Sequence, residues 1–138
     1  MPVASLTIDI KAFMEDLKKL SDAARGNALE EAINAGGLEL ENEIKLHIEK
    51  NKLVKTGNLL NSIKKGPAKV SDTSAEVEVG TNVPYAARLE FGFSGADSLG
   101  RIYNQPARPY MRPAVDEGKD RIEQAVSVTL KRNIEAAV

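Results

Sequence analysis

The chain of 138 residues has no cysteine and no tryptophan, and it has only three tyrosines and three phenylalanines. The lack of cysteine excludes a disulfide scaffold, thiolate metal sites and a cysteine nucleophile. Because aromatic residues are scarce, the core is expected to consist of Leu, Ile, Val and Ala. No apolar run approaches the roughly 20 residues that a membrane span needs, and the N-terminus lacks a secretory signal pattern. We therefore expect no membrane association.

The sequence gives little support for a catalytic site. His47 is the only histidine, so a mechanism that needs an imidazole base would have to use it. No GxSxG motif accompanies it, and Gly92 to Gly95 lacks the Lys and Ser/Thr of a phosphate-binding loop. His47 and Glu43 together supply too few ligands for a zinc site. Two of the 20 acidic residues could still converge as a catalytic pair, although no pattern favours one. We predict a non-enzymatic protein with no cofactor, no metal and no catalytic residue.

The length fits one domain spanning residues 1–138, and the net charge of -1 is unevenly distributed. Residues 1–50 carry 6 basic and 10 acidic side chains, whereas residues 51–112 carry 9 and 5. The simpler interpretation is that these segments attract each other within one fold. The alternative is a basic surface that meets an acidic partner or DNA.

Hydrophobic periodicity predicts an α+β fold, in which a small antiparallel β-sheet packs against two long α-helices, with short additional helices. In the first half of the chain we expect a strand at 3–8, a helix at 10–20 capped by Asp9 and a helix at 22–51 capped by Asp22. A helical turn capped by Thr56 follows, and then two strands, at 62–70 and 75–80, that are joined as a hairpin. The remaining elements are a short helix after Pro84, a flexible loop at 92–105 and a long C-terminal helix after Pro113. The first of the two strands in the hairpin is expected to be interrupted at Gly66 and Pro67.

The two long helices are expected to pack through apolar stripes with helical spacing. These are Leu29, Ile33, Gly36, Leu40, Ile44 and Ile48 in the first, and Met111, Val115, Gly118, Ile122, Val126, Leu130 and Ile134 in the second. Gly36 and Gly37 imply either a bend or another backbone packed close to the helix, and close packing is favoured. Glu117 and Arg121 have the spacing of an exposed ion pair within the helix.

Three segments, in this order and spacing, resemble one known family. They read TGNLLNSI at 56–63, VGTNVPYAARLEFG at 79–92 and PARPYMRPA at 106–114. Each is similar to a signature of the gene-product-ten-like tail-component family of lambdoid long-tailed bacteriophages and prophages, which comprises neck or tail-completion proteins. The resemblance implies a structural role at the head–tail junction and assignment to the virion, after assembly in the cytoplasm of the bacterial host.

The resemblance also implies which residues serve structure and assembly. They are Thr56, Gly57, Leu59, Ser62, Ile63, Gly80, Thr81, Tyr85, Ala86, Glu90, Gly92, Arg108, Pro109, Tyr110, Arg112 and Pro113. Glu90 is expected to form an ion pair with Arg108 or Arg112, holding the proline-rich segment against the short helix. The expected partners are further copies in a ring, head-connector proteins and tail proteins. The alternative function is a DNA-contacting protein that lines the neck channel.

Overall fold

The computed structural model describes residues 3–9, 13–51, 57–71, 74–96 and 98–137, which form five helices and six strands. The helices are α1 (Met14–Lys18), α2 (Asp22–Lys50), α3 (Asn58–Ser62), α4 (Ala86–Phe91) and α5 (Met111–Ala137). The strands are β1 (Val3–Asp9), β2 (Lys64–Lys65), β3 (Lys69–Val70), β4 (Ser74–Gly80), β5 (Phe93–Ala96) and β6 (Ile102–Gln105). The predicted α+β class is confirmed.

A four-stranded antiparallel sheet has β4 at its centre, with β1 on one side and the short strands β2 and β3 on the other. The apolar side chains of β4 alternate with Glu76 and Glu78, so that one face is buried and the other is exposed. The predicted interruption at Gly66 and Pro67 is confirmed, because it separates β2 from β3. Lys69 stands opposite Glu76, so that opposite charges are neighbours across the β3–β4 pair.

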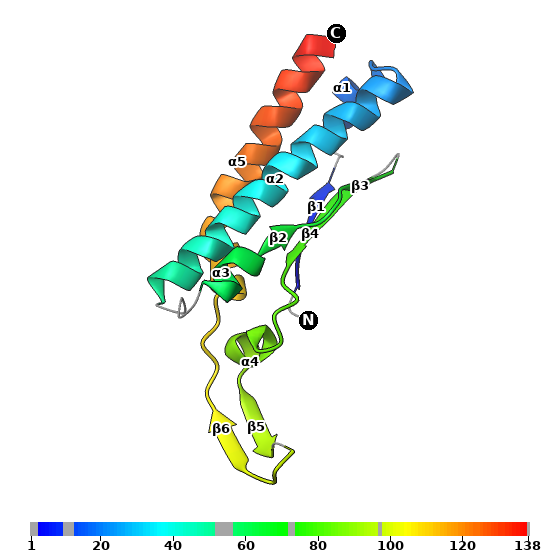
Figure 1. Cartoon of the computed structure of the whole chain (residues 1–138). Coiled ribbons are helices and arrows are strands. Elements are labelled where there is room, and N and C mark those ends of the chain that lie inside the picture. Colours follow the sequence, from blue (N-terminus) through cyan, green and yellow to red (C-terminus); the bar gives the residue numbers. More distant parts are fainter. Residues whose placement is uncertain (1–2, 10–12, 52–56, 72–73, 97, 138) are drawn as a thin grey trace.

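The two long helices lie side by side over the buried face of the sheet (Figure 1). Between them and the sheet, the buried core is almost entirely aliphatic. The close-packing interpretation of Gly36 and Gly37 is confirmed, since α2 is unbroken there. A Cβ atom on Gly36 would lie 2.5 Å from Val126 Cγ2 and 2.6 Å from Leu6 Cδ2. Glycine therefore lets α2 approach both α5 and β1.

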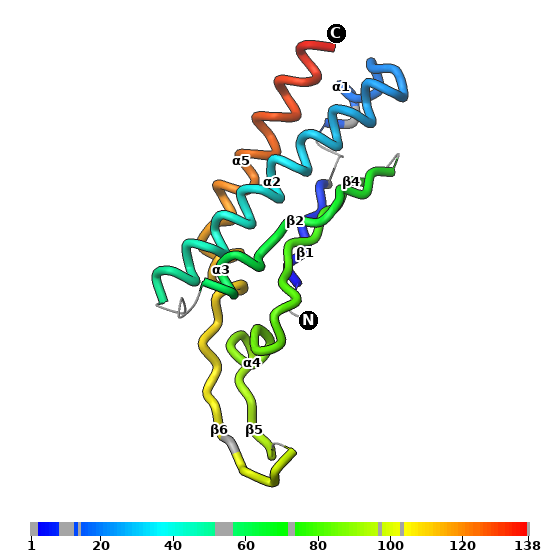
Figure 2. The backbone as a smooth tube through the Cα atoms, viewed as in Figure 1, coloured from blue at the N-terminus to red at the C-terminus, as the bar shows by residue number. Residues whose placement is uncertain are grey.

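The segment predicted as a flexible loop at 92–105 is instead a β-hairpin, formed by β5 and β6. It extends away from the helices and the sheet, at the opposite end of the molecule from the C-terminus (Figure 2). Glycine and serine in β5 weaken the alternation that identifies strands in a sequence, and this concealed the hairpin. We call residues 93–105 the arm, and the four-stranded sheet with α1, α2, α3 and α5 the body.

Two helix starts and one buried position in α5 differ from the predictions. Ser21, rather than Asp22, caps α2, and its hydroxyl accepts a hydrogen bond from Ala24 N at 3.2 Å. Asp9 belongs to β1 and does not cap α1. Val115 is 38% exposed, whereas Ala114 is buried in its place within the α5 stripe. The register of α5 therefore turns Ala114, not Val115, toward α2.

Candidate assembly site

The family motifs meet where the arm joins the body, a region that we call the joint. The joint is formed by α3, α4 and the start of α5, which lie together at the lower end of the two long helices (Figure 1). Leu59, Ile63, Ala86 and Tyr110 are all buried in the same apolar cluster. Segments far apart in the sequence are thus held together around one small core.

Glu90 is the central polar residue of the joint, and the residue is only 7% exposed. Its Oε1 accepts hydrogen bonds from Tyr110 N at 3.1 Å and Met111 N at 2.7 Å, and its Oε2 accepts from Arg112 N at 3.5 Å. The first amides of a helix lack partners within the helix, and their positive end favours an anion. Glu90 on α4 therefore caps the beginning of α5.

The predicted ion pair between Glu90 and an arginine side chain is wrong. The carboxylate meets backbone amides, because α4 aims it at the N-terminus of α5 instead of at the outward side chains of Arg108 and Arg112. The Arg108 guanidinium donates to Asn51 O at 2.8 Å, at the end of α2. Its backbone N donates to Leu89 O at 2.7 Å.

Tyr110 fixes α4 from the other direction. Its ring is fully buried, and its hydroxyl donates to Ala86 O at 3.1 Å. Burial and the nearby Glu90 carboxylate raise the pKa of this hydroxyl well above its ordinary value. Tyr85 is in contrast 42% exposed. Tyr110 thus connects the proline-rich segment to the first turn of α4.

Ser62 and Thr81 connect the first motif to the second. Their hydroxyl oxygens are 2.5 Å apart, Ser62 Oγ also donates to Leu59 O at 2.7 Å, and Thr81 Oγ1 accepts from Val83 N at 3.1 Å. These bonds hold the end of α3 against the exit of β4. The two hydroxyls therefore satisfy local backbone groups, which is a structural task.

Gly92 makes the turn from α4 into the arm. Its φ of 77° lies in the left-handed region, and a Cβ atom here would lie 2.9 Å from Gln105 O. Only glycine suits both the dihedral angle and the close approach of β6. The Arg88 guanidinium lies 3.9 Å from the centre of the Phe93 ring and attaches the arm to α4.

The remaining motif residues lie around the same joint. Gly57, with a φ of 78°, precedes α3, and Gly80 ends β4. Pro109 O accepts from Asn51 Nδ2 at 3.4 Å, and Pro113 lies partly buried in the first turn of α5. Thr56, predicted to cap α3, lies outside the described residues. The described motif residues therefore lie in the joint or, like Gly80 and Thr81 at the end of β4, directly beside it.

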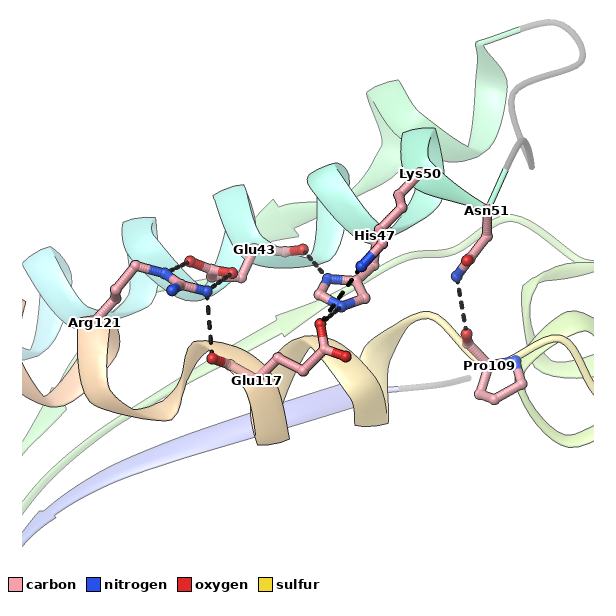
Figure 3. Close-up of polar contacts among 7 residues, drawn as sticks. All are labelled: Glu43, His47, Lys50, Asn51, Pro109, Glu117 and Arg121. Atoms are coloured by element: carbon pink, nitrogen blue, oxygen red, sulfur yellow. Dashed lines mark hydrogen bonds and ion pairs between the residues drawn. The ribbon is translucent and has the colours of Figure 1, made fainter.

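A second polar cluster, which the sequence did not predict, lies between α2 and α5 (Figure 3). Glu43 on α2 is 2% exposed, and both of its carboxylate oxygens accept from the Arg121 guanidinium of α5, Oε2 at 3.0 Å from Nη2. Such a bidentate pair, with two parallel hydrogen bonds, is stronger than an ion pair with a single contact. The guanidinium lowers the pKa of Glu43 and raises that of Arg121.

His47 lies one turn further along α2 and is buried. Its Nδ1 lies 3.0 Å from Glu43 O and its Nε2 lies 2.7 Å from Glu117 Oε2. The hydrogen bond with His47 lowers the pKa of Glu117, and Lys50, at 4.0 Å, adds to the effect. The expected pair between the Glu117 and Arg121 side chains is wrong, since both side chains turn toward α2 instead.

One feature of the sequence could have indicated this cluster. Gly118 lies in the apolar stripe of α5, where a Cβ atom would lie 2.7 Å from Glu43 Cγ. A glycine inside a helix stripe signals a close neighbour, but it cannot reveal that the neighbour is a carboxylate from a residue far away in the sequence. Within the part of the chain that the structure describes, every buried side-chain nitrogen and oxygen has a hydrogen-bond partner.

The carboxylates of both clusters hold elements of the chain to one another. Among the described residues, no three His, Asp or Glu side chains are grouped so that they could hold a metal ion. Glu90 and Glu43 are each used in full by groups of the chain itself. The described helices include none with the length and apolar character needed to cross a membrane. The arrangement positions structural elements relative to one another.

The joint, with its motifs and buried cap, has the character of a structural scaffold, and a family comparison identifies the class. Residues 11–92, more than half of the chain, match the family described as "Bacteriophage HK97-gp10, putative tail-component". The chain belongs to this family of bacteriophage tail components, and the predicted resemblance is confirmed. No curated protein and no solved structure matches the chain.

Proposed function

We propose that the protein is a structural component of the head–tail junction, a neck or tail-completion protein that virion assembly requires. The observation that carries the proposal is membership of the tail-component family, over a region that includes the first two motifs. The third motif supplies Tyr110 and the start of α5, which complete the joint. In this function the protein connects other proteins and catalyses no reaction.

A junction protein must repeat around the axis that the head and the tail share, so we propose a homo-oligomeric ring in contact with head-connector and tail proteins. The assembled ring would be part of the virion. The acidic first region and the basic middle region are already in contact within one copy, where Lys65 N donates to Glu41 Oε1 at 2.9 Å and Lys65 Nζ donates to Asn34 Oδ1 at 3.0 Å.

Charge on the sheet does not favour the DNA-contacting alternative. The exposed face carries Lys64 and Lys69, but Glu76 and Glu78 of β4 lie on the same face. DNA binding through phosphates requires a predominantly basic surface, whereas this one is mixed.

Inactivating the gene in an inducible phage or prophage tests the proposed function. We expect DNA-filled heads and tails of normal length to accumulate separately, and purified protein added to the lysate to restore joined particles. Electron microscopy and plaque counts would measure the result. Joined particles in the absence of the protein, or lysates that lack tails, would contradict a role at the junction.

A further inference from the structure

The arm exposes an unusual amount of apolar surface. Ile102 is 86% exposed and Leu99 is 74% exposed, and Phe91 at the base of the arm is 72% exposed. No arm residue whose side chain the structure describes is buried. An isolated two-stranded hairpin is marginally stable in water, so an arm with an apolar tip is suited to packing against another surface.

A complementary surface lies on the body side of the joint. A hollow of about 300 Å³ is bordered by β1, by the end of α4 and by the first turns of α5, where Val3, Phe91 and Val115 supply partly exposed apolar side chains. Arg112 and Asp116 also border it. An apolar cavity of about 150 Å³ can admit benzene, so this hollow has room for an aliphatic side chain.

The tip and the hollow of one copy are too far apart to meet. Each arm strand has four residues, which span roughly 13 Å, and the hairpin points away from the body (Figure 1). The hollow lies at the base of the arm and the exposed Ile102 near its tip. A contact between them must therefore join two different copies.

We propose that Ile102 and Leu99 at the tip of one arm insert into the hollow beside Val115 of the next copy. The contact uses two different surfaces of the same chain, so it is heterologous and can repeat from copy to copy until a ring closes. An apolar centre bordered by charged residues is the usual composition of a specific interface. This inference rests on the proposed function, for which it supplies the contact between copies.

The absence of cysteine in the sequence allows a direct test with single-cysteine variants. Purified Ile102→Cys and Val115→Cys proteins would be mixed in equal amounts and oxidised, and the disulfide-linked dimers would be counted by mass spectrometry. The matched control replaces Val115→Cys with Leu38→Cys, because Leu38 is also exposed but lies on α2 away from the hollow. Thermal melting would verify that each variant is folded.

We expect mixed dimers of the first pair to form about tenfold faster than those of the control pair, because docking raises the effective concentration of one thiol beside the other. They should also outnumber the dimers of either variant with itself. Equal rates for the two pairs would overturn the tip-to-hollow contact, and an excess of Ile102→Cys dimers would show tip-to-tip contact instead. Because purified protein is used, either failure would leave the head–tail joining test unaffected.

Discussion

The body and the arm differ in how their side chains are used. The body buries two aliphatic clusters between its helices and its sheet, and each of its central polar groups has a partner within the chain. The arm buries no side chain that the structure describes, and it is attached through Gly92 and the stacking of Arg88 on Phe93. The buried core that stabilises the fold therefore lies in the body, whereas the arm contributes exposed apolar surface. Glu90 and Tyr110 fix the segments between the two.

The largest expected effect on stability lies in the body, where Gly36 of α2 contacts α5 and β1. Gly36→Ala should lower the free energy of unfolding by about 1–3 kcal/mol, because the new methyl group would overlap Val126 and Leu6. Gly26→Ala is the matched control, since Gly26 lies in the same helix with no atom near its added Cβ. It should raise stability by up to about 1 kcal/mol. Urea denaturation measures both, and equal effects would show that Gly36 is not a packing position.

The joint should be the next most sensitive region. Glu90→Gln should lower the free energy of unfolding by about 1–2 kcal/mol, because a neutral amide oxygen replaces a carboxylate that serves the amides of Tyr110 and Met111. Glu123→Gln, at an exposed position of α5, should change it by less than about 0.5 kcal/mol. Chemical denaturation of the two variants provides the comparison. Identical curves for Glu90→Gln and the wild type would reject the cap.

Much of the fold followed from the sequence, because amphipathic patterns are local. The stripes of α2 and α5, the alternation of β4 and the break at Gly66 and Pro67 all correspond to structure. The motifs indicated which residues gather at the joint, but they could not show that Glu90 would meet amides rather than arginines. Contact partners depend on three-dimensional register, as the Glu43–Arg121 pair across 78 positions illustrates. The arm was missed because glycine and serine obscured its alternation.

A smaller effect concerns acid stability of the body. The pKa of Glu43 is lowered by Arg121 from its ordinary value of 4.5, so the unfolded chain binds more protons below about that pH. The stabilisation is present above pH 4.5 and is lost as the pH falls through the lowered pKa. The raised pKa of Glu39, caused by burial and by Glu43, opposes part of this loss.

Arg121→Gln should remove this contribution. At neutral pH we expect a modest loss of stability, because the Arg121 side chain is more than half exposed and solvent screens its charge. The difference from the wild type should shrink as the pH falls below about 4.5. Denaturation at pH 7 and at pH 3 measures it. A difference that stays constant with pH would refute the assignment of the effect to the carboxylate of Glu43.

The smallest folding effect is expected in the arm. Ile102→Ser should change the free energy of unfolding by less than about 0.5 kcal/mol, because the side chain is 86% exposed. The same variant should nevertheless fail to restore joined particles in the lysate assay. Thermal melting and particle counts separate the two properties. A markedly lower melting temperature, or full restoration of joining, would break the proposed division between body and arm.

Hydrogen exchange on the free and the assembled protein measures whether the body alone provides the stable fold and whether the arm becomes protected on assembly. Amides of α2, β4 and α5 should be protected in both states, because they belong to the packed body. Amides of the described arm residues should exchange rapidly in free protein and become protected on assembly. Two results would contradict the proposal that the body provides the stable fold and the arm forms the contact between copies. They are strong protection of the arm amides before assembly and an unchanged exchange rate of these amides after assembly.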